Sequence, residues 1–345
     1  MSLRVLTISE SSEWDKIVHS FYKYDVYYLS GYVKAFKIHG DGEPLLFFYE
    51  DESVRGINVV MKRDIADIPQ FSQLMDCNTM FDFSTPYGYG GWLIEGENTK
   101  SLFGDYELWC KEHHIVSEFV RFHPVLGNHR TSEEAYSVIP LGETVAMDLS
   151  SADTIWNNLT SKNRNTIRKA IKNNVKVYNG RYPEIFNKFI NVYNITMDKD
   201  DAKGYYYFKP EFYQSILDDL AQNAQIFYAQ IPDGTVIASS IMIGANGLLN
   251  YHLSGFLQEY GTLAATNLIL YEAALWGCEN GYRMLYLGGG VGSKEDGLFK
   301  FKKSFFRGDL HRFYIGKKIF EKEKYNELVD LSGKVDGGYF PEYRG

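Results

Sequence analysis

The chain has 345 residues, with 36 Lys and Arg against 44 Asp and Glu, so its formal net charge is −8. This balance excludes a protein that coats duplex DNA, because that task needs a broad positive field. Hydrophobic residues make up 45% of the chain and charged residues 23%, which is typical of globular proteins and not of disordered ones. The length predicts two domains.

No stretch of the sequence predicts a membrane span or a secretory signal, because charged residues interrupt every apolar run well before about 18 residues. The three cysteines, Cys77, Cys110 and Cys278, are too few and too widely spaced for a disulfide framework. None of them has a Cys or His at metal-ligand spacing. We therefore expect a cytoplasmic protein without a metal site.

The first part of the chain predicts two paired strands, a helix and a further strand. Alternating apolar residues indicate the strands, and the acidic turn at 51–53 joins the first two. Apolar residues at helical spacing indicate the helix. The predicted elements are strands at 44–50, 54–62 and 116–122 and a helix near 99–113.

The second part of the chain repeats this order of elements. Asn246-Gly247 is a strong hairpin signal between two of its strands. Two copies of one α/β (α+β) unit, each a mixed β-sheet flanked by helices, are the simplest account. The predicted elements are strands at 226–231, 236–244, 248–256 and 284–287 and a helix near 263–279.

Charge divides unevenly between these two parts. Residues 1–146 carry a net charge of −10 and residues 147–345 a net charge of +2. Ser151 and its polar neighbours are typical of a helix cap between two patterned regions. We therefore predict an acidic first domain at 1–148 and a second domain at 149–345 that holds the basic patches.

The most distinctive basic segment is SKNRNTIRKAIKNNVKV, residues 161–177, within a stretch from 154 to 183 that has no acidic residue. On a helix, Arg164, Arg168 and Lys172 lie on one face, with Lys176 near its C-terminal end, opposite an apolar stripe. The segment is either a solvated basic face or a surface for an anionic substrate. A second basic patch, at 297–308, interleaves lysines with phenylalanines, which suits a ligand with phosphates and flat rings.

Two glycine-containing segments invite comparison with phosphate-binding loops. Residues 288–294, GGGVGSK, fit neither the Walker A pattern nor the dinucleotide fingerprint, so we interpret them as a turn that allows close approach of a substrate. Residues 258–263, QEYGTL, resemble the pyrophosphate loop of GNAT acetyltransferases, although Leu263 stands where that loop has Gly or Ala. Gln258, Gly261 and Gly289 are thus candidate residues of an acyl-donor loop.

Six further segments carry a resemblance to a known family. They are SGYVKAF (30–36), PYGYGGW (86–92), SEFVRFHP (117–124), SKNRNTIRKAIKNNVKV (161–177), YNITMDKDDAKGYYYF (193–208) and YLGGGVGSKEDGLFKFKKSF (286–305). Together they resemble the Fem family of peptidoglycan-bridge aminoacyltransferases, along nearly the whole chain. The resemblance implies two tandem GNAT-like domains and transfer of an amino acid from aminoacyl-tRNA to an amine of a UDP- or lipid-linked peptidoglycan precursor, with no other cofactor. The chain looks like the compact type without the coiled-coil arm found in some members.

The resemblance also implies roles for single residues. Lys302 matches the family's transition-state lysine, and Phe301 lies beside the acceptor end of the tRNA. Lys34 matches a lysine that contacts the diphosphate of the precursor. Lys199 departs from the pattern, since many relatives have Arg there, and an ammonium cannot make a bidentate phosphate contact. Candidate substrate-binding residues are Lys34, Tyr32, Lys199, Tyr206, Arg164 and Arg168.

Two other functions stay open at the level of the sequence. An acyl-CoA-dependent N-acyltransferase, with acetyl-CoA as donor and an amino sugar or another small amine as acceptor, would use the same double-GNAT frame. A non-catalytic module that binds nucleotide-sugar or glycan ligands is the third alternative. No nucleophile motif such as Gly-x-Ser-x-Gly or Cys-x-x-Cys occurs in the sequence, in keeping with direct aminolysis of an activated ester.

Overall fold

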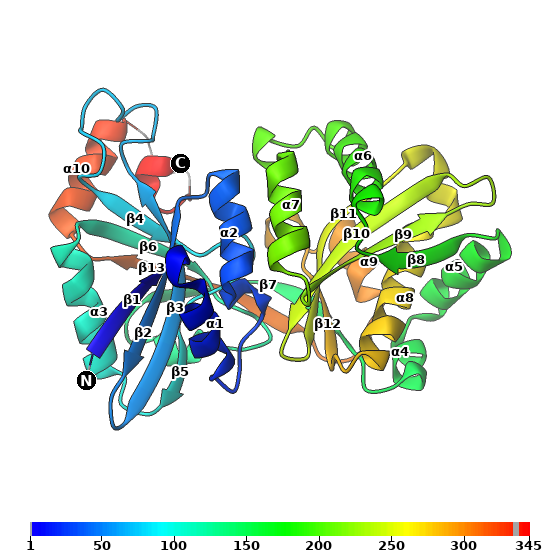
Figure 1. Ribbon diagram of the computed structural model, residues 1–345, viewed down its shortest axis with the longest axis horizontal. Coiled ribbons are helices and arrows are strands. Elements are labelled where there is room, and N and C mark those ends of the chain that lie inside the picture. Colours follow the sequence, from blue (N-terminus) through cyan, green and yellow to red (C-terminus); the bar gives the residue numbers. More distant parts are fainter. Residues whose placement is uncertain (1, 334–337) are drawn as a thin grey trace. The chain divides into compact units, whose positions relative to one another are not determined.

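The computed structural model describes residues 2–333 and 338–345, which form two compact units. Unit 1 contains Met1–Leu141 and Phe313–Gly345, and unit 2 contains Gly142–Arg312. Each unit has a mixed α/β architecture, with a sheet flanked by helices (Figure 1). No helix within the two described ranges is long and apolar enough to cross a membrane.

In unit 1 the strand order is β1-β2-β3-β4-β6-β13, with β5 paired to β3. Its elements are β1 (Ser2–Thr7), α1 (Ser11–His19), α2 (Ser30–His39), β2 (Glu43–Glu50), β3 (Val54–Asp64), β4 (Phe81–Ser84), β5 (Leu93–Gly96), α3 (Lys100–Glu112), β6 (Ile115–Arg121), β13 (His311–Ile319) and α10 (Lys322–Ser332).

In unit 2 the strand order is β7-β12-β11-β10-β9-β8. Its elements are β7 (Ser137–Asp148), α4 (Ala152–Asn158), α5 (Ser161–Lys172), β8 (Lys176–Gly180), α6 (Pro183–Lys199), α7 (Pro210–Asp219), β9 (Ala224–Gln230), β10 (Val236–Ala245), β11 (Leu248–Phe256), α8 (Ala265–Glu279), β12 (Met284–Gly288) and α9 (Gly297–Lys303), together with the 3-10 helix η5 (Gln258–Leu263).

The two sheets repeat one topology, which confirms the predicted duplication. In unit 1 three antiparallel pairings lead from β1 to β4, and the chain then passes through the extra strand β5 and helix α3 to the parallel strand β6. In unit 2 the same pattern leads from β8 to β11, and α8 connects β11 to the parallel strand β12. A parallel pair needs such a crossover connection, which is why a helix stands at this point in both halves of the sequence.

The sixth strand of each sheet comes from outside its own half of the sequence. β7 follows β6 along the chain but pairs antiparallel with β12 in unit 2. β13 follows the unit 2 elements but pairs antiparallel with β6 in unit 1. The structural units therefore differ from the predicted domains at 1–148 and 149–345, because residues 313–345 pack on unit 1.

The predicted strands and helices are present, with ends shifted by a few residues. Asn246 and Gly247 both have positive φ, as the predicted hairpin requires. The basic helix is shorter than predicted: α5 ends at Lys172, and Lys176 begins β8. Asn174 adopts φ +57° just after α5, and the amide of Val175 bonds to the carbonyl of Ala170, which ends the helix.

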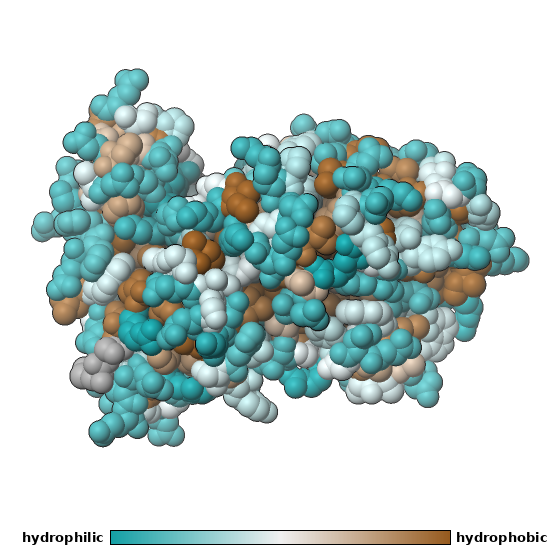
Figure 2. Space-filling view, in the orientation of Figure 1, coloured by the Kyte–Doolittle hydropathy of each residue, from teal (hydrophilic) through white to brown (hydrophobic). Residues whose placement is uncertain are grey.

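In unit 2, helices α4, α5, α8 and α9 contribute to one hydrophobic core with the sheet. Ile167 and Ala170 of α5 and Phe299 of α9 are among its buried side chains, so most of the apolar stripe of the basic helix faces the core, whereas Ile171 of the same stripe is 52% exposed. Full burial of a side chain the size of Ile167 or Phe299 contributes about 1.5–3 kcal/mol. Figure 2 shows that hydrophilic residues predominate on the visible face and that the exposed apolar residues form small separate patches.

Candidate functional site

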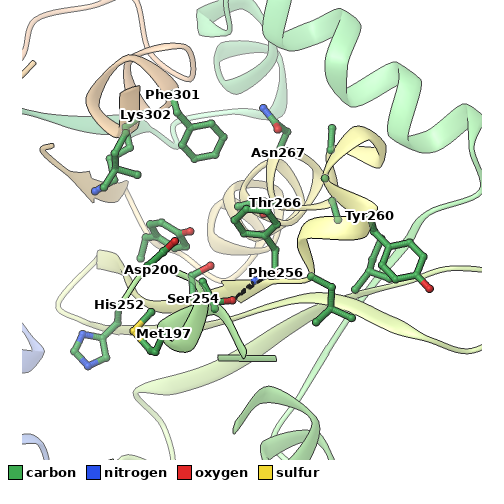
Figure 3. A pocket seen from close by; sticks show the side chains of 18 residues that line it. Met197, Asp200, His252, Ser254, Phe256, Tyr260, Thr266, Asn267, Phe301 and Lys302 are labelled. Atoms are coloured by element: carbon green, nitrogen blue, oxygen red, sulfur yellow. Dashed lines mark hydrogen bonds between the residues drawn. The ribbon is translucent and has the colours of Figure 1, made fainter. Parts of the chain in front are cut away.

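A cavity of about 540 Å³ lies in unit 2, where the parallel strands β11 and β12 separate. The two strands are paired only at 248–250 and 284–286, and beyond this point Tyr251, His252, Ser254 and Phe256 of β11 line the cavity. The end of α6, the start of α8 and helix α9 supply the other walls (Figure 3). Its lining is largely apolar with a few polar groups, as is typical of small-molecule sites.

Helix α9 presents Phe301 and Lys302 to this cavity. Asp296 caps the helix by accepting a hydrogen bond from the amide of Phe299 at 2.8 Å, and it also accepts one from the amide of Val291 at 3.0 Å. These bonds lower the pKa of the Asp296 carboxyl. The buried ring of Phe299 anchors the helix in the core, and Leu298, Phe301 and Lys302 of the same helix line the cavity.

Lys302 is the titratable group most suited to chemistry in this cavity. Its Nζ donates a hydrogen bond to the carbonyl oxygen of Gly289 at 2.8 Å. Burial lowers its pKa from 10.5 to about 8, and the charge of Asp296 opposes that shift. At neutral pH Lys302 is mainly a poorly solvated ammonium group, which can stabilise a developing oxyanion and can exchange a proton with little cost.

Other polar groups surround the cavity. The N-terminus of α8 opens on to it with Ala265, Thr266 and Asn267, and no side chain of the described residues caps that helix. The positive end of the helix dipole therefore favours a carbonyl oxygen or an anion at this wall. His252 of β11 is neutral at physiological pH, because burial lowers its pKa to about 3.

Three of the predicted residues, Phe301, Lys302 and Gly261, line this one cavity, and Gly289 accepts the hydrogen bond of Lys302. Gln258 is exposed at the start of η5. The predicted acyl-donor loop at 258–263 forms the 3-10 helix η5, in which the amide of Tyr260 and the amide that follows η5, of Ala264, bond to main-chain carbonyls. Those two amides are not available to a pyrophosphate.

Lys199 lies at the rim of the cavity. Its Nζ is 2.9 Å from Oδ1 of Asp200 and 4.6 Å from the ring centre of Phe256, and both partners line the cavity. Tyr206 lies in a short 3-10 helix, Gly204–Tyr206, with its ring 5.5 Å from that of Tyr205. It is not among the residues that line the cavity.

The two arginines of α5 have different environments. Nη1 of Arg164 donates a hydrogen bond to the carbonyl of Leu159 at 2.7 Å, so this guanidinium caps the C-terminal end of α4. Arg168 donates to the side chain of Asn165 and lies 5.1 Å above the ring of Trp156, with its residue exposed to solvent. Arg168 is therefore the better placed of the two to meet a substrate.

Tyr32 and Lys34 belong to unit 1, on α2. The hydroxyl of Tyr32, a buried residue, donates to the carbonyl oxygen of Tyr87 in the glycine-aromatic segment, so Tyr32 holds that segment against α2. Lys34 is exposed, whereas the other residues from Ser30 to Phe36 are buried.

Sequence reasoning missed several polar residues of the cavity, among them Asp200, Ser254 and Asn267. Nδ2 of Asn267 donates to the side-chain oxygen of Asn163 on α5 at 2.9 Å, which ties the basic helix to the cavity wall. A lone amide or hydroxyl inside an apolar pattern gives no functional signal. The one signal that could have drawn attention to Asn267 is its position in the first turns of a predicted helix.

The comparisons with known proteins agree with this geometry. Residues 161–303 match the family model described as acetyltransferase (GNAT) domain. The crystal structure of FemX has a TM-score of 0.69 to this chain at 13% sequence identity, covering 95% of this chain and 99% of its own. A comparison with curated protein sequences gives no significant match.

Two further solved structures share the fold. The C-terminal domain of a protein from Agrobacterium fabrum, assigned as a lysylphosphatidylglycerol synthetase, has a TM-score of 0.58 at 14% identity and covers 97% of this chain and 99% of its own. A conserved protein of unknown function from Bacteroides thetaiotaomicron has a TM-score of 0.60 at 12% identity and covers 92% and 99%. The chain thus has a Fem-like tandem GNAT fold, and the GNAT match supports an acyltransferase.

Proposed function

We propose that the protein is an aminoacyltransferase that moves an aminoacyl group from aminoacyl-tRNA to an amine of a UDP- or lipid-linked cell-wall precursor. The observation that carries the proposal is Lys302, a lysine with its pKa lowered to about 8 that faces a cavity at the split between the parallel strands of a GNAT domain. The similarity in fold to FemX and the Fem-like sequence segments support the choice of donor and acceptor.

The reaction needs little from the protein beyond alignment and charge stabilisation. The acceptor amine attacks the carbonyl carbon of the aminoacyl ester, and the resulting tetrahedral oxyanion meets the ammonium of Lys302. The ester C–O bond then breaks, an amide bond remains, and the ribose oxygen of the tRNA takes the proton that the amine loses. A positioned charge at the oxyanion lowers the activation barrier and accelerates the reaction by about 10²–10³-fold.

The rest of the cavity suits an acyl donor with an aromatic end. Phe301 lies next to Lys302 on the cavity wall and can stack on the terminal adenine of the donor. The uncapped N-terminus of α8 offers amides to a carbonyl oxygen or a phosphate. For the acceptor, Lys34 is the residue that would bind the diphosphate of the precursor. Lys199, at the rim of the cavity, is a further candidate substrate-binding residue.

An acyl-CoA-dependent N-acyltransferase is the second candidate, and the match of residues 161–303 to the GNAT acetyltransferase model favours it. The 3-10 helix at 258–263 argues against it, because two amides at and just after this segment are already bonded. The fold also occurs in a protein assigned as a lysylphosphatidylglycerol synthetase, so the fold alone does not fix the acceptor.

The test is single-turnover transfer from aminoacyl-tRNA to a precursor amine by Lys302→Met. We expect a loss of about 10²–10³-fold in rate with an unchanged unfolding temperature, because Met fills the space of the lysine stem without its charge. Lys303→Met, an exposed neighbour on the same helix, is the matched control and should retain transfer within a few-fold. Full transfer by Lys302→Met would remove Lys302 from the mechanism.

The donor is tested by thermal shift. Millimolar coenzyme A stabilises a protein that binds it specifically, through mass action. We expect no shift with coenzyme A and a salt-sensitive shift with tRNA. Stabilisation by coenzyme A together with transfer from acetyl-CoA would instead establish the second candidate.

A further inference from the structure

A second cavity, of about 250 Å³, lies in unit 2 at the C-terminal end of helix α8. Its other walls come from the segment that joins α7 to β9 and from strands β9, β10 and β11. The cavity with Lys302 includes the N-terminal end of the same helix. A helix of 15 residues is about 22 Å long, so the two cavities are separate. We call the second one the amide cavity.

The lining of the amide cavity contains no charged residue. A charged ligand would lose its hydration there without gaining an opposite charge, which makes its binding costly. The phosphates of a nucleotide and a free carboxylate are therefore disfavoured as occupants. The lining instead offers aromatic and apolar surface together with four carboxamide side chains, those of Gln222, Asn223, Gln225 and Asn280.

Hydrogen bonds to the main chain fix the orientation of two of these carboxamides. Nδ2 of Asn223 donates to the carbonyl of Gly244 at 2.8 Å, and Nδ2 of Asn280 donates to the carbonyl of Trp276 at 2.8 Å. A carbonyl can only accept, so each amide must turn its nitrogen to the protein. The side-chain oxygens of both residues have no hydrogen-bond partner among residues 2–333 and 338–345.

The two glutamines add to these acceptors. Nε2 of Gln225 donates to the side-chain oxygen of Asn179 at 2.7 Å, and Oε1 of Gln225 accepts nothing from the described part of the chain. Gln222 lies exposed at the rim. The cavity therefore presents acceptor oxygens whose amide nitrogens are already engaged, and it suits a ligand that supplies several hydroxyl donors.

Two half-buried aromatic rings, of Trp276 and Tyr282, form the flat part of the lining. Their centroids are 5.8 Å apart with planes 32° apart, and Trp276 also meets Phe227 edge to face at 5.6 Å. Gly244 leaves room for Tyr282, since a Cβ there would lie 2.7 Å from its Cε1 atom. Rings held in this way offer a fixed apolar surface with a polar edge. The C–H face of a sugar ring packs on such a surface and leaves its hydroxyls available to donate.

The rim of the amide cavity is held in place by the protein itself. Arg181 donates to the carbonyls of Leu217 and Ala221. The amide of Gly244 donates to the carbonyl of Asn223 at 2.7 Å, so the segment after α7 is also tied to β10. A preformed site of this kind loses little conformational freedom when a ligand binds.

We propose that the amide cavity binds one ring of an uncharged pyranose sugar. The hydroxyls of the sugar donate to the side-chain oxygens of Asn223, Gln225 and Asn280, and its C–H face lies against Trp276. The volume of about 250 Å³ is below the roughly 300–1,000 Å³ usual for drug-sized ligands, so the cavity fits a single ring. Binding of a sugar here goes beyond the proposed transfer reaction and does not depend on it.

The experiment follows binding through the NMR signals of the indole N–H groups, since the chain has 5 tryptophans. Trp276→Phe removes one signal and so identifies that of Trp276. The methyl glycosides of glucose, galactose, mannose and N-acetylglucosamine are titrated separately into the wild-type protein. We expect at least one of them to shift the Trp276 signal saturably, with a Kd on the order of 1 mM, and to leave the other indole signals in place.

Two variants test the cavity itself. Gln222→Leu/Gln225→Leu removes two acceptors and should weaken binding about tenfold, because each hydrogen bond contributes a factor of about 2–10. Ala221→Trp adds bulk at the rim and should abolish binding. Gln214→Leu/Gln230→Leu is the matched control for the first variant. Gln214 is exposed like Gln222, Gln230 is half-buried like Gln225, and neither lines the cavity, so the control should bind as wild type does.

The unfolding temperature of each variant separates loss of binding from loss of folding. If no glycoside shifts the Trp276 signal at concentrations well above the expected Kd, the inference is overturned. Equal binding by the two double glutamine variants, with Ala221→Trp still binding, would overturn it as well. If Lys302→Met loses the sugar and Gln222→Leu/Gln225→Leu keeps it, the sugar occupies the cavity with Lys302 and the amide cavity is not its site.

Discussion

The ammonium of Lys302 is costly to bury and is held by one main-chain carbonyl, that of Gly289. A lysine whose folded pKa is about 8 instead of 10.5 loses its proton close to the working pH. Any catalytic use of its charge must therefore disappear above that pH. Asp296 moderates the shift, so the same carboxylate that caps α9 also keeps Lys302 charged.

This predicts a specific pH dependence of transfer. The activity of Lys302 as an oxyanion-stabilising cation is present below pH 8 and falls as the pH rises through 8, because deprotonation removes the charge. Lys302→Arg retains a charge at every accessible pH, so the ratio of wild-type to variant kcat/KM should fall above pH about 8. The ratio cancels the titration of the acceptor amine. A ratio that rises through pH 8 would instead make the neutral amine of Lys302 a base.

At the scale of elements, α9 is a seven-residue helix and depends on its surroundings, since isolated helices of that length are not stable. Phe299 anchors it from below, and Asp296 holds its first turn and the Val291 amide together. Gly290 makes this arrangement possible. A Cβ at Gly290 would lie 2.1 Å from the carbonyl of Lys294 and 2.4 Å from Oδ1 of Asp296.

We therefore expect Gly290→Ala to displace the cap of α9 and, with it, Lys302. Misplacement of a catalytic group by about 1 Å costs about 10²-fold in rate, while unfolding measurements should show a loss of only about 1–3 kcal/mol. Gly297→Ala is the matched control, because nothing lies within 4 Å of a Cβ there. Similar single-turnover rates for the two alanine variants would contradict this role of Gly290.

Local sequence patterns predicted the individual helices and strands well, but they predicted less well where these elements end and how they meet. A run of apolar residues and the Asn246-Gly247 turn were enough for β10 and β11, because β10 is buried along nearly its whole length and β11 follows it directly in a hairpin. The basic helix, predicted with Lys176 near its C-terminal end, ends at Lys172 because Asn174 takes a left-handed conformation. The Asn173-Asn174 sequence allows this conformation but does not require it. Lys302 was recognisable from a motif block, whereas Asn267 and Asp200 depend on how α6, α8 and β11 meet, which no local pattern encodes.

At the scale of the whole molecule, β7 completes the unit 2 sheet and β13 completes the unit 1 sheet. This exchange of strands means that the chain cannot be cut at one point into two complete units. Residues 315–319 of β13 complete the unit 1 sheet along β6. Beyond β13, Phe320, Tyr325 and Tyr343 are buried in unit 1 cores. The sequence repeat suggested two consecutive domains, and it could not reveal the exchange because β7 and β13 occupy equivalent places in the two copies.

A chain truncated after Arg312 tests this arrangement. It would leave the edge of β6 unpaired and remove Phe320, Tyr325 and Tyr343, each worth about 3–5 kcal/mol when buried. Asp82 would lose Arg344 and the Tyr343 hydroxyl and keep Arg63 at 2.8 Å as its cation. The summed loss is comparable to the 5–15 kcal/mol by which a domain is usually stable, so unit 1 should unfold.

Hydrogen exchange followed by mass spectrometry measures the loss of folded structure in each unit separately. Peptides from β3 and β6 should lose protection in the truncated chain, and peptides from β10 and β11 should retain it, because unit 2 keeps all six of its strands. Added peptide 313–345 should restore protection in β6, since it supplies the missing strand. Unchanged protection of β6 after truncation would show that the first 141 residues fold without β13, and that the unit boundaries do not follow the strand exchange.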